Sequence, residues 1–194
     1  MESKSNKEIP AIEQLEEELK RERDKRRKKT VFKSTIYTLA TVAAVAVLVA
    51  TLWLPVLEIY GNSMTPTLQD GEIVFSMKTS DLEPGDIVAF YYNNNILVKR
   101  VVCGPADWID IDGDGNVYVN GVELDEPYLS EKALGDSNIE LPYQVPDGKV
   151  FVMGDHRSTS VDSRNTSVGC VAYDQIVGKI IFRIWPLDKI GSVE

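Results

Sequence analysis

The sequence predicts a mainly β domain behind one N-terminal transmembrane helix, and three observations predict this fold class. Residues 34–54 are 21 residues without a charge, about the length that a helix needs to cross a bilayer. After Pro55 the chain changes to short runs rich in Val, Ile, Tyr and Phe, separated by Gly, Pro, Asp and Asn, which is typical of β-strands. Helical periodicity of useful length is not found after residue 55.

The chain of 194 residues, 43% of them hydrophobic, has room for one span and one globular domain. We expect a charged cytoplasmic tail at residues 1–30, a transmembrane anchor at 31–54 and an extracytoplasmic β-rich domain at 55–194. The basic cluster at 21–29 precedes the span and Glu58 follows it, so the Lys/Arg asymmetry places the N-terminus in the cytoplasm. A cleaved signal peptide is disfavoured by the long charged N-region and by the bulky residues 52–54. The lipid bilayer is therefore an expected partner.

Charge is distributed unevenly along the chain. The first 33 residues carry 11 Lys and Arg against 8 Asp and Glu, whereas residues 34–194 carry 10 against 22. An acidic domain lacks the basic face that phosphate contacts need, which argues against nucleic acid as a partner. Cys103 and Cys170 are too few for a zinc site or a disulfide framework, and two buried thiols are favoured over a disulfide.

The strands are expected from the alternation of apolar and polar residues. The predicted strands are 56–60, 72–77, 86–92, 96–103, 108–111, 117–119, 149–153 and 176–185. Before the span, Ile12, Leu15 and Leu19 lie at helical spacing and predict a short solvated helix. Residues 110–115 copy the start of a calcium loop, but the twelfth position is Gly121 instead of a bidentate Glu, so a turn between two strands is favoured.

Ser63 lies in a turn just past the span. Gly61 permits conformations closed to other residues, and Pro66 stops a helix from running through, so the serine is presented on a bend. Taken alone, one serine in a Gly/Pro-rich turn indicates a plain loop. A serine hydroxyl becomes a nucleophile only when a neighbouring base accepts its proton.

Two residues are candidates for that base. His156 is compatible with a Ser-His-Asp arrangement that uses Asp155 or Asp162. Lys99 is favoured: it follows apolar Val98 in a predicted strand, and we expect either Lys99 or Arg100 to point inward. Burial lowers the pKa of a lysine and makes the neutral amine available as a base. The alternative interpretation is that both cations lie on an edge strand, where their charges discourage aggregation.

Five sequence blocks together resemble one known family, the bacterial type I signal peptidases, over roughly residues 31–186. The blocks are Gly-Asn-Ser-Met-Thr-Pro-Thr-Leu at 61–68, Pro-Gly-Asp-Ile-Val at 84–88, Val-Lys-Arg-Val-Val at 98–102, Gly-Asp-His-Arg-x-x-Ser-x-Asp-Ser-Arg at 154–164 and Val-Gly-Lys at 177–179. The chain departs from the family at Cys103-Gly104-Pro105-Ala106-Asp107, where Gly-Leu-Pro-Gly-Asp is usual, and at His156, where asparagine is common. The resemblance implies coiled antiparallel β-sheets with an SH3-like barrel portion.

The resemblance also implies a role for each matching residue. The expected catalytic residues are Ser63 as nucleophile and Lys99 as general base. Ser160 is expected to orient the lysine amine, and the backbone N–H of Ser63 with Gly61 is expected to bind the oxyanion. The remaining roles are pocket walls at Met64 and Val98, and loop-shaping ion pairs among Asp155, Asp162, Arg164 and Arg100. His156 is interpreted as structural.

The implied function is removal of signal peptides from exported precursors by a membrane-anchored serine endopeptidase. Its substrates carry small residues one and three positions before the cut, and no metal, organic cofactor or obligate protein partner is expected. The expected location is the cytoplasmic membrane. Two alternatives remain: a self-cleaving repressor-type Ser-Lys protease, disfavoured by the span, and a non-catalytic anchored assembly factor for pili or envelope on the same fold.

Overall fold

The computed structural model describes residues 12–53 and 55–193. Residues 1–11 of the predicted tail and Leu54 of the predicted anchor lie outside the described residues. The chain separates into two units, residues 1–49 and 50–194. The first includes most of the N-terminal helix, and the second includes the β domain.

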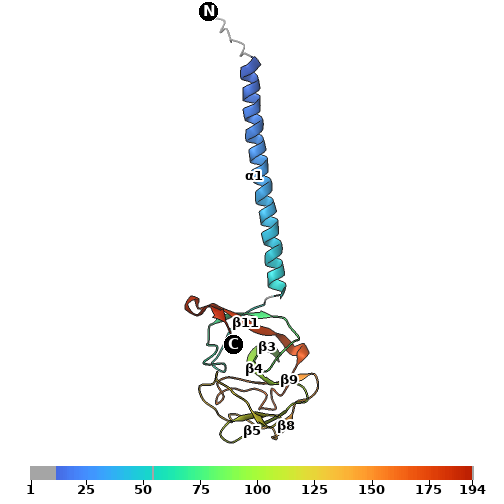
Figure 1. Ribbon diagram of the computed structural model, residues 1–194, viewed down its shortest axis with the longest axis vertical. Helices are drawn as coiled ribbons and strands as arrows, with labels where there is room; N and C mark the ends of the chain where they lie inside the picture. Colours follow the sequence, from blue (N-terminus) through green and yellow to red (C-terminus); the bar gives the residue numbers. More distant parts are fainter. Residues whose placement is uncertain (1–11, 54, 194) are drawn as a thin grey trace, which may run out of the picture. The chain divides into compact units, whose positions relative to one another are not determined.

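Figure 1 draws α1 (Ile12–Trp53) as one helix without a break. Neither Pro nor Gly occurs between its ends, so nothing in the sequence interrupts it. The expected tail helix and the expected span are therefore one element. Between residues 15 and 49 this helix is long and apolar enough to cross a membrane. Thr35, Thr38 and Thr41 donate their hydroxyls to carbonyls four residues earlier, so these polar groups are satisfied within the helix.

The β domain contains a large antiparallel sheet in the order β1-β2-β11-β3-β4-β9-β10, with β12 also paired to β11. Figure 1 shows β11, β3, β4 and β9 in this part of the domain. The strands are β1 (Val56–Glu58), β2 (Ile73–Met77), β3 (Ile87–Tyr92), β4 (Asn95–Cys103), β9 (Lys149–Met153), β10 (Val171–Ala172), β11 (Ile176–Trp185) and β12 (Gly191–Ser192). Two short 3₁₀ helices, η1 (Tyr173–Gln175) and η2 (Leu187–Lys189), lie on either side of β11 in sequence.

A second antiparallel sheet has the order β7-β6-β5-β8 and includes the β5 and β8 labels of Figure 1. Its strands are β5 (Trp108–Ile111), β6 (Val117–Val119), β7 (Val122–Glu123) and β8 (Tyr143–Gln144). The turn between β5 and β6 holds the calcium-like residues. Asp112 accepts hydrogen bonds there from the side chain of Asn116 and from the backbone of Asn116 and Asp114, and these bonds lower its pKa. The predicted strand-joining turn is confirmed.

The large sheet has apolar residues on both faces. Along β3, Ile87 and Ala89 belong to one core cluster, whereas Val88 and Phe90 belong to another. This two-sided burial explains why β3 is a continuous apolar run without polar alternation. A third cluster joins the end of β4 to the second sheet and includes Cys103.

All eight predicted strands are present, and their ends differ from the prediction by two residues at most. Four two-residue strands, β7, β8, β10 and β12, were not predicted. Two residues are too few to show a period, and each of these strands is defined by its pairing with a longer one. The SH3-like barrel portion remains a prediction.

Candidate active site

Ser63 lies in the turn that follows β1. Gly61 has a φ of 84°, in the left-handed region that favours glycine, and its N–H donates to Asp70 Oδ1 at 2.6 Å. The backbone N–H and the hydroxyl of Thr65 both donate to the Asn62 carbonyl, at 3.1 and 2.9 Å. These bonds fix the turn, in which Ser63 is half-buried.

Lys99 approaches the serine from β4. Its Nζ lies 2.6 Å from Ser63 Oγ and 3.1 Å from the Val98 carbonyl oxygen, and the residue is only 3% exposed. In the described part of the chain, Lys99 forms no ion pair with a carboxylate. A buried amine with two neutral hydrogen-bond partners is thus directed at the hydroxyl.

The surroundings of Lys99 favour its neutral form. Burial lowers the pKa of Lys99 from 10.5 to about 8, against the opposing influence of the Asp162 and Asp155 carboxylates. Arg164 acts in the same direction as burial. Burial at this position therefore lowers the pKa of Lys99 into a range in which part of the amine is neutral and can accept a proton.

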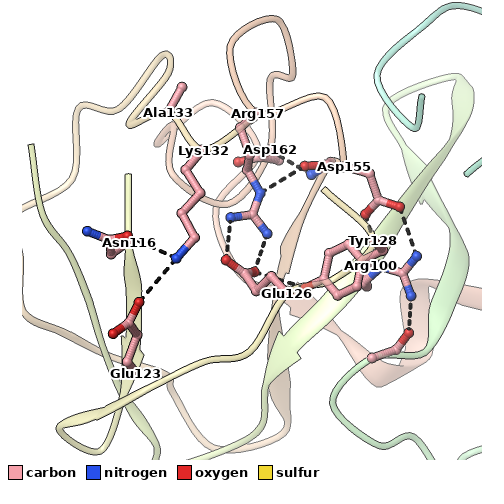
Figure 2. A network of polar contacts seen from close by, with 12 residues as sticks. Arg100, Asn116, Glu123, Glu126, Tyr128, Lys132, Ala133, Asp155, Arg157 and Asp162 are labelled. Carbon is pink, nitrogen blue, oxygen red and sulfur yellow. Dashed lines mark hydrogen bonds and ion pairs between the residues drawn. The ribbon is translucent and has the colours of Figure 1, made fainter. Parts of the chain in front are cut away.

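Arg100, the neighbouring cation, is also buried, so the expectation that only one of the two points inward is wrong. Its guanidinium binds Asp155 through two hydrogen bonds of 3.0 and 2.8 Å. It also lies 3.9 Å from the centre of the Tyr128 ring. Figure 2 shows the two side chains next to each other. Alternation placed the two side chains on opposite faces, but both faces of this sheet are covered, so both cations are enclosed.

Asp162 and Arg164 form a fully buried pair in the loop that follows β9, with a distance of 2.8 Å. Burial favours the neutral acid, but the Arg164 guanidinium and the Gly154 N–H hold the pKa of Asp162 below its usual range. Arg164 also donates to the carbonyls of Leu134 and Arg157. The pair thus connects the backbone at Gly154 and Arg157 with the backbone at Leu134.

Ser160 is buried in the same loop, beside Gly154. A Cβ on Gly154 would collide with Ser160 Oγ and with the Ser63 carbonyl oxygen, so the glycine permits this close approach. Within the described residues, Ser160 Oγ forms no hydrogen bond of ordinary geometry, but it lies near enough to Asp162 to help lower the pKa of that carboxylate. No hydrogen bond from Lys99 to Ser160 is formed. The lysine-orienting role of Ser160 stays a prediction.

His156 is placed where it cannot act on Ser63 through its ring. Its Nδ1 lies 3.0 Å from Thr65 Oγ1, and its Nε2 lies 3.8 Å from a carboxylate oxygen of Glu131. Asp155 and Asp162 are engaged by arginines. The Ser-His-Asp arrangement is not formed. The backbone N–H of His156 instead donates to the Ser63 carbonyl at 3.0 Å, which agrees with a structural role.

Sequence reasoning missed a further buried ion pair, between Arg157 and Glu126. Two hydrogen bonds join the side chains, and Tyr128 donates its hydroxyl to the same carboxylate at 2.9 Å (Figure 2). Glu126 and Arg157 are 31 positions apart, so no local pattern could have revealed the pair. Through Tyr128 and Arg100, the pair joins the segment after β7 to the active-site strand.

A groove of about 670 Å³ opens beside the serine. It is lined by residues 56–61 from β1 and its continuation, by residues 94–99 from the start of β4, and by Ser63 and Met64. Val98 and Met64, the predicted pocket walls, therefore both line it. In the described structure, β1 pairs only with β2, and the pairing of β4 with β9 begins at Arg100, so both strands present a free edge to the groove.

The two predicted oxyanion donors, the N–H groups of Gly61 and Ser63, differ in whether they are already hydrogen-bonded. The Gly61 N–H is occupied by Asp70, which contradicts its expected role in this conformation. For the Ser63 N–H, no acceptor is found among the described residues. Asp70 was not predicted because its hydrogen bond spans nine residues and follows no sequence period.

Cys103 and Cys170 are free thiols in one core cluster. Burial raises the pKa of Cys103 to about 12 and also raises the pKa of Cys170. Cys103 is buried and Cys170 is half-buried, which agrees with the interpretation of both as small apolar side chains.

Comparison with known proteins identifies the class. Residues 32–185 match the model of the family described as signal peptidase, peptidase S26. The matched range includes the Ser63 turn, the Lys99 strand and the loop after β9, and it covers most of the chain. The chain belongs to this family.

Two relatives found by sequence agree with this assignment. Signal peptidase IB of Staphylococcus aureus strain Mu50 is 40% identical over 151 residues, which cover 68% of this chain and 78% of the relative. Signal peptidase I of Bacillus amyloliquefaciens is 34% identical over 187 residues, which cover 91% of this chain and 100% of the relative. The crystal structure of a signal peptidase I from Enterococcus faecalis V583 aligns with a TM-score of 0.41 and 28% identity, covering 51% of this chain and 96% of that chain.

Proposed function

We propose that this chain is a membrane-anchored serine endopeptidase that cleaves signal peptides from exported precursors, with Ser63 as nucleophile and Lys99 as general base. Family membership supports the reaction. The observation that carries the assignment of residues is the 2.6 Å separation of Lys99 Nζ and Ser63 Oγ inside a buried site. A nucleophile and its base must lie within this reach.

The lowered pKa makes Lys99 a usable base. With a pKa of about 8, half of the lysines are neutral at that pH. With the ordinary value of about 10.4, well under ~1% would be neutral at the same pH. Burial of the amine thus increases the active fraction of the enzyme by roughly two orders of magnitude.

In the proposed reaction, Ser63 Oγ attacks the carbonyl carbon of the scissile bond while its proton passes to Lys99. The resulting ammonium protonates the leaving amine, and the acyl-enzyme is hydrolysed by a water that gives its proton to the same lysine. The Ser63 N–H is the proposed oxyanion donor. Serine and lysine supply both nucleophile and base, so the proposed steps use no metal or organic cofactor.

Ser160 is the proposed third member of the site. Its hydroxyl is buried beside Gly154, close to the position that a Cβ there would share with the Ser63 carbonyl oxygen. It helps to lower the pKa of Asp162 but forms no hydrogen bond of ordinary geometry in the described structure. An unpaired buried hydroxyl is unfavourable by about 1–3 kcal/mol unless some state of the site satisfies it. A hydrogen bond with the Lys99 amine during the reaction would do so and would also orient the amine.

The groove suits an extended peptide. The free edges of β1 and β4 offer backbone hydrogen-bonding groups to a substrate strand laid between them. Alternate side chains of that strand would point toward Met64 and Val98, which leave room for small residues. We propose that these are the residues one and three positions before the cut.

The protein is membrane-anchored, and we propose the cytoplasmic membrane with the N-terminus inside and the β domain outside. The supporting feature is the basic cluster at 21–29 on the N-terminal side of the apolar part of α1. Substrates that are themselves held in the bilayer by an apolar segment would then meet the site at high effective concentration.

Single substitutions test the proposal in the full-length protein in detergent. Ser63→Ala and Lys99→Ala should each reduce cleavage of a precursor with an Ala-x-Ala segment by roughly 100- to 10,000-fold. Ser80→Ala and Lys78→Ala, at exposed positions outside the groove, are the matched controls and should remain active. Full activity of either active-site variant would contradict the mechanism. An inactive wild type would favour the non-catalytic assembly factor.

A further inference from the structure

The outer rim of the groove carries a carboxylate that the proposed reaction does not use. Residues alternate along β1 and its continuation, so that Leu57 and Ile59 face the core whereas Val56, Glu58 and Tyr60 are exposed. The Tyr60 hydroxyl donates to Glu58 Oε2 at 2.9 Å. This bond holds the carboxylate at the edge of the groove, which both side chains line.

The charge of Glu58 is not compensated locally. Among the described residues, Glu58 forms no ion pair, and the groove lining contains one other charged residue, the buried Lys99. A second carboxylate, Asp70, is near enough to act on the Tyr60 hydroxyl, whose pKa is raised by Glu58 first and by Asp70 to a smaller degree. The rim beside β1 is therefore acidic.

A substrate strand beside β1 would meet this rim at fixed positions. Side chains alternate along an extended peptide, so if the first and third residues before the cut enter the groove, the second and fourth point outward. The outward-pointing substrate residues lie on the same side of the sheet as Glu58. Side chains that lie opposite each other on adjacent strands are about 4.5–5.5 Å apart at Cβ. A charged substrate side chain at these positions can thus interact with Glu58.

We infer that Glu58 is a specificity-determining residue that favours basic side chains, and disfavours acidic ones, at the second and fourth substrate positions before the cut. This inference rests on the proposed function, because it requires a peptide bound along β1. It concerns selection among substrates and leaves the chemical steps unchanged.

The expected effect is modest. Cross-strand pairs of opposite charge contribute roughly a 1.4- to 5-fold change in an equilibrium constant, and like charges oppose binding to a similar degree. A Lys peptide should therefore exceed the matching Glu peptide by roughly 2- to 25-fold in kcat/KM at low salt. Since the pair is exposed, the preference should shrink as salt is added.

The test uses full-length protein in neutral detergent and three peptides that share an Ala-x-Ala segment and carry Lys, Gln or Glu at the second position. A second set carries the same residues at the fourth position. The variants are Glu58→Gln, the charge-reversing Glu58→Lys, and Glu140→Gln as a control with the same charge change at an exposed site outside the groove. The readout is the ratio of kcat/KM for Lys and Glu peptides, with the Gln peptide reporting basal activity.

The inference predicts that the ratio falls toward one in Glu58→Gln, inverts in Glu58→Lys and stays at the wild-type value in Glu140→Gln. A wild-type ratio of one in both peptide sets, or a preference for Lys that persists in Glu58→Gln, would overturn the inference. Normal cleavage of the Gln peptide in the same experiment would leave the proposed function intact. Failure of the wild type to cleave any peptide would overturn the proposed function and this inference with it.

Discussion

Replacing Lys99 by methionine should stabilise the fold while abolishing activity. The pKa of Lys99 falls from 10.5 to about 8 on folding because the amine is buried. Each tenfold change in a protonation equilibrium corresponds to about 1.4 kcal/mol, so the protonated lysine opposes folding by roughly 3 kcal/mol. Methionine has a similar volume and no charge. After about 1 kcal/mol is subtracted for the lost amine hydrogen bonds, the expected gain near neutral pH is about 2 kcal/mol.

The pH dependence of this gain follows from the direction in which folding moves the pKa of Lys99. Between about pH 8 and pH 10.5 the unfolded chain binds more protons at this site than the folded protein, so wild-type stability rises with pH across that window. The unfavourable contribution is complete below the window and absent above it. The advantage of Lys99→Met should therefore be largest at about pH 7, and above about pH 10.5 it should give way to a loss of about 1 kcal/mol, because only the missing amine hydrogen bonds then count.

Urea unfolding of the full-length protein in detergent, followed by tryptophan fluorescence, measures this effect at both ends of the window. Lys78→Met is the control, because that lysine is exposed and its replacement should change the free energy of unfolding little at either pH. Destabilisation by Lys99→Met at neutral pH, or a gain that does not change with pH, would refute the reasoning that burial opposes the charged lysine.

Three further substitutions test other parts of the site. Glu126→Gln leaves Arg157 buried without its partner and should lower the free energy of unfolding by about 3 kcal/mol or more; an unchanged urea midpoint would contradict the buried pair. Asp70→Ala releases the Gly61 N–H and should lower kcat by roughly tenfold with little change in KM, because the turn that carries the nucleophile is loosened; unchanged kcat would argue against a positioning role. His156→Ala should keep activity within roughly tenfold of wild type, because its ring does not reach the serine; full inactivation of a folded variant would revive the histidine as base.

The sequence predicted the features that local patterns encode. The uncharged run predicted the span, alternation predicted the longer strands, and Gly61 with Pro66 predicted a turn at Ser63. Lys99 was found because a cation within an apolar strand is unusual, and the structure places its amine beside the serine hydroxyl.

The parts that were missed depend on contacts between distant residues. Only one of Lys99 and Arg100 was expected to point inward, because alternation does not show that both faces of a sheet are covered, but both residues are buried. Asp70 occupies the Gly61 N–H, and Glu126 pairs with Arg157, through bonds that no sequence period specifies. These contacts are set by packing of loops, which is determined only when the whole domain has folded.

The pH dependence of kcat/KM tests the central claim, that neutral Lys99 is the base for Ser63, most directly. Activity on an Ala-x-Ala peptide should rise with pH as the lysine loses its proton, increase by about 50-fold from about pH 6 to about pH 8, and level off above a midpoint of about 8. A midpoint near ~6.5, typical of histidine, or a rise that continues toward ~10.4, typical of an unperturbed lysine, would contradict the account.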